Sequence, residues 1–108
     1  MPETSLLRRH QRVPLDAAVR LTWEDAQGVQ RVGKGKCVDI SETGMGVLTP
    51  ENIPLRSYIQ FRVDKIRFNG TGSVRYATRK GLNYVIGLEF AGALHWNPDG
   101  QSGPVRSH

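Results

Sequence analysis

Apolar side chains recur at every second position in several separate stretches of this chain, and this period most restricts how it can fold. Polar or small residues occupy most of the positions between them. Successive side chains of a strand point to opposite faces, so the alternation predicts strands with one buried and one exposed face. The three clearest stretches contain Val19, Leu21 and Trp23; Ile59, Phe61 and Val63; and Tyr84, Ile86, Leu88 and Phe90.

Three further stretches, 29–40, 45–49 and 66–77, are rich in Val, Ile, Thr, Phe and Tyr and predict the remaining strands. Turn-forming residues separate the stretches, and no window of about a dozen residues has a helical period. At 108 residues the chain is one domain with a single modest core. About six short strands of this kind predict a small barrel or sandwich, which buries one face of the sheet. Bulges or tight curvature are expected at glycines 33, 35, 70 and 72.

The two ends of the chain lack the alternating pattern. Residues 1–12 contain Leu6 and Leu7 as apolar anchors, followed by three arginines, and predict a flexible N-terminal arm. Residues 13–92 hold the predicted strands. Residues 93–108 are rich in Gly and Pro, so we expect a poorly ordered C-terminal tail beyond about Trp96.

The chain is basic, with 15 Lys and Arg against 10 Asp and Glu and a formal net charge of +5. Such a charge attracts anions, including nucleotides, nucleic acid and acidic membrane surfaces. A single cysteine, Cys37, cannot form an internal disulfide, and nothing after Met1 has the pattern of an export signal. No apolar stretch reaches the roughly 20 residues that span a bilayer. We therefore expect a cytoplasmic protein without membrane insertion.

The arm carries a cluster of arginines, Arg8, Arg9 and Arg12. Such a cluster can be a solvated basic surface or a nucleic-acid contact. A guanidinium group also binds phosphate oxygens or a guanine edge with two parallel hydrogen bonds, and it stacks on a purine. The cluster therefore indicates an anionic ligand, and its guanidinium groups also suit a purine.

A second motif, Asp39-x-Ser41-x-x-Gly44, follows about thirty residues later. Asp and Ser often stabilise turns through their own side chains, and Gly ends strands, so the motif can have a purely structural role. It also suits a ligand, because Gly44 and Gly46 leave the backbone accessible. A carboxylate there can accept hydrogen bonds from N1–H and N2–H of guanine.

In this order and at this separation, Arg8-x-x-x-Arg12 and Asp39-x-Ser41-x-x-Gly44 resemble the motifs of the PilZ domain family. The stretch from Arg12 into the first strand and the last alternating stretch, 84–90, are also similar to that family. The resemblance extends over about residues 6–92. It implies a six-stranded antiparallel β-barrel that acts as a non-enzymatic receptor for cyclic di-GMP, a bacterial second messenger.

The resemblance also implies roles for the arm. Arg8 and Arg12 would bind the phosphates and guanine, and Arg9 would add positive charge. Leu7 stands where a further arginine could help to bind a second, stacked dinucleotide, so we expect one ligand per chain. The arm would close over the ligand and so change a surface presented to an unidentified protein effector.

On the barrel side, the resemblance implies that Asp39 and Ser41 make polar contacts with the ligand. Gly44 would admit the ligand through its small size, and Gly46 continues this small-residue surface. Many family members have a C-terminal helix that this chain lacks, so we expect a monomer. No cofactor, metal ion or catalytic residue is expected.

Other functions were weighed against this one. A small basic barrel can bind single-stranded nucleic acid, with Tyr58, Tyr76 and Trp96 as platforms for bases. A ligand-independent adaptor for protein interactions is another possibility, although the intact motifs argue against it. Gly28 to Lys34 matches part of a phosphate-binding loop, but Gly35 follows where Ser or Thr would bind magnesium. Catalysis is the least favoured reading, because the histidines lie only in the arm and the tail.

Overall fold

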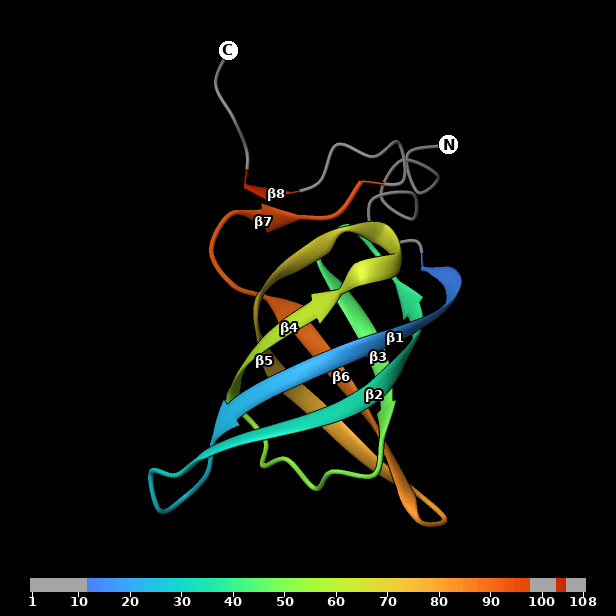
Figure 1. Cartoon of the computed structure of the whole chain (residues 1–108). Helices are drawn as coiled ribbons and strands as arrows, with labels where there is room; N and C mark the ends of the chain where they lie inside the picture. Colours follow the sequence, from blue (N-terminus) through green and yellow to red (C-terminus); the bar gives the residue numbers. More distant parts are fainter. Residues whose placement is uncertain (1–11, 98–102, 105–108) are drawn as a thin grey trace.

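Six strands form a closed antiparallel barrel in the computed structural model of the chain, which describes residues 12–97 and 103–104 (Figure 1). The barrel strands are β1 (Val13–Glu24), β2 (Gln30–Ile40), β3 (Gly44–Thr49), β4 (Tyr58–Val63), β5 (Phe68–Lys80) and β6 (Asn83–Phe90). A 3-10 helix, η1 (Asp64–Ile66), connects β4 to β5, and β7 (Leu94–His95) pairs with β8 (Gly103–Pro104). The predicted all-β fold with a six-stranded antiparallel barrel is confirmed.

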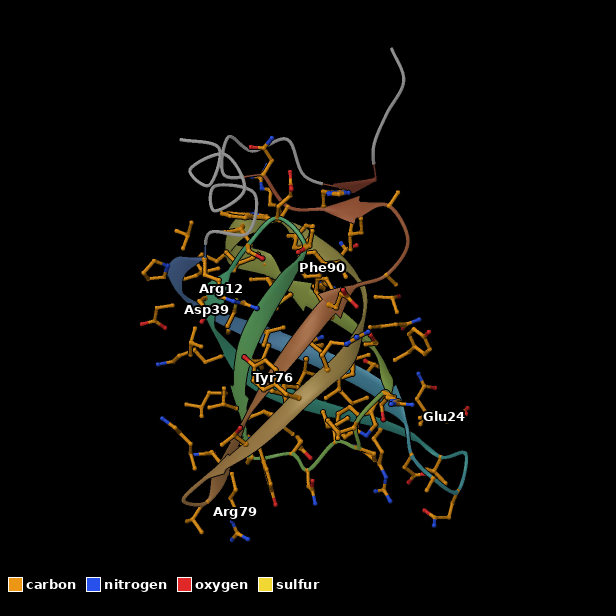
Figure 2. All side chains as sticks on the ribbon, turned by 180° about the vertical axis from the view of Figure 1, so that it is seen from behind. Arg12, Glu24, Asp39, Tyr76, Arg79 and Phe90 are labelled. Carbon is orange, nitrogen blue, oxygen red and sulfur yellow. The ribbon has the colours of Figure 1, made fainter. Side chains whose placement is uncertain are left out.

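The strands follow one another around the barrel in the order β1-β2-β3-β6-β5-β4. Strand β1 pairs with both β2 and β4, and this second pairing closes the barrel. In this ring the β3–β6 pair lies diametrically opposite the β1–β4 pair. Figure 1 views the β1 and β4 side, and Figure 2 views the β3 and β6 side.

The core fills the barrel with the side chains that alternation predicts to face inward. Along β1, Ala17, Val19, Leu21 and Trp23 are all buried, while the residues between them are exposed or half-buried. One cluster of three rings lies among the buried residues, with ring centroids 5.1 to 5.4 Å apart. Its members are Phe61, Phe68 and Phe90.

Three irregularities interrupt the register, between Pro14 and Ala17, between Cys37 and Asp39, and between Val74 and Tyr76. Each adds one residue to its strand, β1, β2 or β5, relative to the partner strand, as a bulge does. The bulges expected at four glycines are not found there, and the alternative expectation of tight curvature stays a prediction. Glycines 33, 35, 70 and 72 pair in regular register.

The chain continues past β6 to cover one end of the barrel. Leu94 packs against the core, and the side chain of Trp96 is buried at 8% exposure. The backbone N–H of Trp96 donates to the carbonyl oxygen of Glu42, at a distance of 3.0 Å. Contacts with the barrel therefore extend beyond residue 92, although the division into arm, barrel and tail stays a prediction.

Within residues 12–97 and 103–104, no helix has the length and apolar character needed to cross a bilayer. The expected arm, with Arg8 and Arg9, lies outside the described residues, apart from Arg12.

Candidate functional site

The segment that links β2 to β3 is a tight turn stabilised by its own serine. The N–H of Ser41 donates to the carbonyl oxygen of Gly44 at 2.8 Å, and the Ser41 hydroxyl lies 3.3 Å from the same oxygen. The N–H of Thr43 donates to this hydroxyl at 3.4 Å. Ser41 is buried at 4% exposure. Its hydroxyl therefore serves the turn, as the structural interpretation of the motif predicts, and lies beneath the surface of the predicted site.

Gly44, the first residue of β3, lies tightly against β6. It pairs with Glu89, and a Cβ atom at Gly44 would collide with the carbonyl oxygen of Leu88. Because that oxygen belongs to the backbone of a central strand, it cannot easily move. The small size of Gly44 is thus required for strand packing, whatever its role toward a ligand.

Asp39 extends from β2 over the neighbouring strand. Its Oδ1 accepts a hydrogen bond from Nη1 of Arg12 at 2.8 Å and another from the backbone N–H of Gly46 at 3.1 Å. A Cβ atom at Gly46 would lie only 2.9 Å from the same oxygen. The glycine therefore gives the carboxylate room to lie against β3.

The bulge in β2 determines this orientation. Cys37 and Asp39 are two residues apart, so an unbroken strand would point both side chains to the same face. The extra residue reverses the alternation, and Cys37 is buried in the core while Asp39 lies outside. The bulge in β5 has the same effect, since Val74 is fully buried and Tyr76, two residues later, is 46% exposed.

Tyr76 is the counterpart of Asp39 on the other side of the same surface. It pairs with Gly87, which pairs with Gly46, which pairs with Asp39. A Cβ atom at Gly87 would collide with the Tyr76 ring, so the ring lies against the bare backbone of β6. We call Gly46 and Gly87 the glycine shelf. A carboxylate and an aromatic ring thus flank two adjacent glycines on the outside of the barrel (Figure 2).

Charged side chains border the glycine shelf. Arg12 and Asp39 form an ion pair whose side chains are 43% and 35% exposed. Arg75 and Glu89 form another at 2.8 Å, with Glu89 opposite Gly44. Exposed pairs of this kind contribute only about 0–1 kcal/mol to stability, so an incoming ligand can replace them at little cost.

A buried thiol lies close to Asp39. Burial, followed by the charge of Asp39, raises the pKa of the Cys37 thiol to about 11. A thiol with such a pKa is protonated and unreactive near neutral pH. In the part of the chain that the structure describes, no three side chains of His, Cys, Asp or Glu are grouped to bind a metal ion.

The structure brings five of the seven predicted site residues to one corner of the barrel. These are Arg12, Asp39, Ser41, Gly44 and Gly46. Arg8 and Arg9 lie outside the described residues. Sequence reasoning missed Arg75 and Gly87, and it considered Tyr76 only as a platform for nucleic acid. A glycine at an outward position of the last strand was the available signal, because it leaves space for a ring on the next strand.

Comparison with known proteins gives an independent assignment. A search of the curated proteins found no match. The family model described as the PilZ domain matches residues 6–94, which is most of the chain and includes both arginine and aspartate motifs. The resemblance inferred from the motifs is thereby confirmed, and this chain belongs to the PilZ domain family.

Proposed function

We propose that this protein is a receptor for cyclic di-GMP that binds the nucleotide on the glycine shelf. The family is in general one of cyclic di-GMP receptors, and its domains are non-enzymatic binding modules. The observation that carries the proposal is the position of the Asp39 carboxylate and the Tyr76 ring over adjacent glycines. The chain itself then has no catalytic role and needs no metal ion or cofactor.

The shelf suits a guanine base. The carboxylate of Asp39 accepts hydrogen bonds from N1–H and N2–H, a pair of donors on one edge that adenine lacks. Stacking on Tyr76 supplies further affinity, and stacking of a base on an aromatic side chain is worth roughly 1–3 kcal/mol. Gly46 and Gly87 leave room for the Asp39 carboxylate and the Tyr76 ring to lie flat against the strands, where both can face the base.

The arm supplies the positive charge. Arg12 already lies at the edge of the shelf, 2.8 Å from Asp39. When guanine replaces Arg12 as the hydrogen-bond partner of the Asp39 carboxylate, the Arg12 guanidinium is free to bind phosphate. Arg8 binds phosphate with it, and Arg9 adds positive charge. Ordering of the arm is then linked to binding, because the ligand neutralises the repulsion among these arginines.

The remaining parts of the proposal concern the cellular role. The protein binds one ligand per chain, acts as a monomer in the cytoplasm and does not insert into a membrane. Closure of the arm alters the surface presented to a protein effector. Ser41 supports the site by fixing the β2–β3 turn, to which it donates its hydroxyl.

Calorimetry and thermal melts with cyclic di-GMP, GMP and a linear di-guanylate test the proposal. At 100 times its dissociation constant, cyclic di-GMP should stabilise the fold by about 2.7 kcal/mol. Arg8→Ala, Asp39→Ala and Tyr76→Ala should each weaken binding at least roughly fivefold, by loss of charge, hydrogen bonds or stacking. The fitted stoichiometry should be one, and a value of two would contradict the single-ligand proposal.

Matched controls are available on the opposite side of the barrel. Asp64→Ala removes an exposed carboxylate that is ion-paired with Arg62, and Tyr58→Ala removes a tyrosine that is 68% exposed. Neither change should alter the affinity for cyclic di-GMP. Absence of any thermal shift at micromolar ligand, or equal effects of the control variants, would refute the proposed site.

Binding of single-stranded nucleic acid stays the alternative, but it has lost one of its expected platforms. The prediction that Trp96 is exposed to bases was wrong, because this side chain is buried against the end of the barrel. Affinity for oligonucleotides that falls steeply with salt and is unaffected by cyclic di-GMP would favour this alternative. An affinity for a protein partner that does not change when cyclic di-GMP is added would favour a ligand-independent adaptor.

A further inference from the structure

Three basic side chains occupy directly opposite positions on adjacent strands, on the side of the barrel away from the glycine shelf. Lys34 on β2 pairs with Arg20 on β1, and Arg20 pairs with Arg62 on β4. All three are exposed and point outward. Since neighbouring strands lie roughly 4.8 Å apart, three positive charges are held within a row only about 10 Å long. We call these three residues the basic row.

Only part of this charge is compensated. Nε of Arg62 lies 2.7 Å from Oδ1 of Asp64. For Arg20 and for the ammonium group of Lys34, the described residues provide no ion pair or side-chain hydrogen bond. Like charges directly opposite one another destabilise a sheet. The fold does not require them, because the next row along the same strands contains Thr22 and Gln60.

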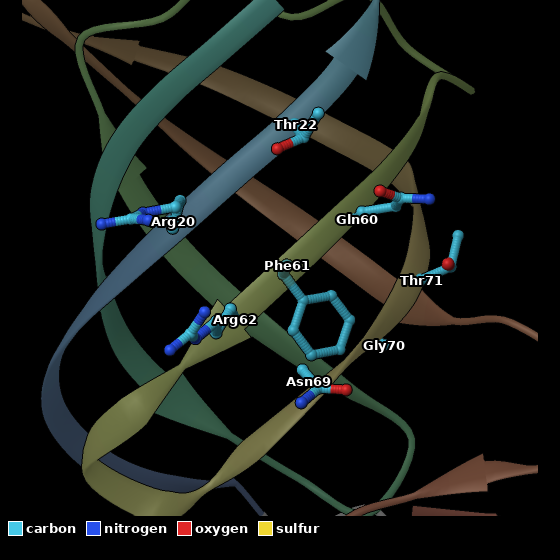
Figure 3. A pocket seen from close by; sticks show the side chains of 8 residues that line it. All are labelled: Arg20, Thr22, Gln60, Phe61, Arg62, Asn69, Gly70 and Thr71. Atoms are coloured by element: carbon cyan, nitrogen blue, oxygen red, sulfur yellow. The ribbon is translucent and has the colours of Figure 1, made fainter.

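The basic row borders a hollow of about 400 Å³ on the outer face of β1, β4 and β5 (Figure 3). Arg20 and Arg62 lie on its wall, and uncharged side chains that form hydrogen bonds complete the polar lining. None of its eight lining residues carries a carboxylate. The uncharged polar lining consists of Thr22, Gln60, Asn69 and Thr71. The hollow thus combines guanidinium groups, which favour anions, with donors and acceptors that suit a peptide backbone.

Apolar side chains lie beside the hollow. Val32, opposite Thr22 on β2, is 68% exposed, and Tyr58 on β4 is also 68% exposed. Tyr58 and Thr22 both line a second hollow of about 320 Å³ that adjoins the first. Tyrosine and arginine are the residue types that most often dominate the energy of protein interfaces.

We propose that the basic row and its hollow form a docking surface for an acidic segment of a protein partner. Carboxylates of the partner bind Arg20 and Arg62. The backbone of the partner forms hydrogen bonds with the amide and hydroxyl groups that line the hollow. Apolar groups of the partner pack against Tyr58 and Val32. A long polyanion fits this surface less well. The row is only about 10 Å long, so it can contact only a few phosphates of a continuous line.

This surface is independent of the proposed nucleotide site. The glycine shelf is centred on β3 and β6, and the basic row is centred on β1 and β4, on the opposite side of the ring. Both can be occupied at once. Loss of one binding activity therefore leaves the other measurable, so the two proposals fail separately.

Fluorescence polarisation with two labelled probes tests the docking surface in the full chain. One probe is a short synthetic peptide that alternates Glu and Ser, and the other is an oligothymidylate of equal charge. The peptide should bind, and the double variant Arg20→Gln/Arg62→Gln should weaken its binding about tenfold. Amide chemical shifts should change on the outer positions of β1 and β4.

The double variant Arg79→Gln/Lys80→Gln is the matched control, since it removes two exposed charges at the far end of β5. It should weaken peptide binding less than about twofold, as expected for a change in overall charge alone. Equal losses in the two double variants, absence of peptide binding, or tighter binding of oligothymidylate through Arg20 and Arg62 would each overturn the proposal. Arg20→Gln should not lower the melting temperature, because it relieves repulsion between like charges.

Discussion

At the scale of single residues, the glycines of the proposed site are required for different physical reasons. A side chain at Gly44 would meet the backbone oxygen of Leu88, whereas a side chain at Gly87 would meet the ring of Tyr76. The first obstacle is rigid. The second is the end of a side chain that is 46% exposed and can turn into solvent.

Gly44→Ala should therefore mainly reduce stability, whereas Gly87→Ala should mainly reduce ligand binding. Overpacking against backbone should lower the free energy of unfolding of Gly44→Ala by about 1–3 kcal/mol. Gly87→Ala should change stability by less than about 1 kcal/mol but weaken cyclic di-GMP binding about as much as Tyr76→Ala, because both lose the stacking platform. Chemical denaturation and calorimetry measure the two quantities. Equal destabilisation by both variants would contradict this explanation.

The buried thiol of Cys37 provides a test that depends on pH. Its pKa is raised to about 11 from an ordinary value of 9.0, so the native state keeps the thiol protonated longer than the unfolded state does. The resulting stabilisation is complete below pH 9 and is lost as pH rises from 9 toward 11. A Cys37→Ala variant should not show this particular loss in pH-dependent melts.

Native protein at pH 8 should react with a thiol reagent such as iodoacetamide much more slowly than protein unfolded in guanidinium chloride, since the reagent needs an exposed thiolate. Equal rates in the two states would show that the strand around Cys37 opens readily.

At the scale of secondary-structure elements, two bulged strands determine which side chains reach the proposed site. The bulge in β2 directs Asp39 outward, and the bulge in β5 directs Tyr76 outward. Between them, β3 and β6 contribute glycines at the paired positions. The segment after β6 stabilises the β2–β3 turn, because the backbone N–H of Trp96 donates a hydrogen bond to the carbonyl oxygen of Glu42, next to Ser41.

Trp96→Ala should destabilise the barrel although it lies in a segment rich in Gly and Pro. Loss of a large buried side chain at the rim of the core should lower the free energy of unfolding by about 2–4 kcal/mol. For a domain of this size, each kcal/mol corresponds to roughly 4–8 °C in melting temperature. Thermal and chemical denaturation measure the effect. His95→Ala, at the half-buried neighbouring position, is the control and should cost less than about 1 kcal/mol.

At the scale of the whole molecule, the alternation of apolar residues predicted three of the six strands and the side of each that faces the core, and residue types that favour strands predicted the other three. That success has a simple cause, because the closed barrel buries one face of every strand. The proposed site was predictable where its residues belong to the two motifs, as for Arg12 and for Asp39 to Gly44. Tyr76 was considered only as an exposed platform for nucleic acid, because its position beside Asp39 depends on a bulge in β5 and on pairing across β6 and β3.

A bulge depends on how many residues one strand has relative to its partner, so the pattern within a single strand does not reveal it. The same holds for Trp96. Its neighbours predict little order, yet its side chain is buried in the core cluster, and its backbone N–H donates to Glu42 in a turn more than fifty residues earlier in the chain. Features that arise from pairing and packing between distant segments therefore needed the structure.

The order of strands around the barrel has a consequence for how such a protein can diversify. The β3–β6 pair and the β1–β4 pair have no strand in common, and the core separates them. Outward side chains of one pair can therefore be exchanged without disturbing those of the other. The outward positions of β1 and β4 are thus a place where new partner specificity can be engineered or selected while the surface on β3 and β6 is kept.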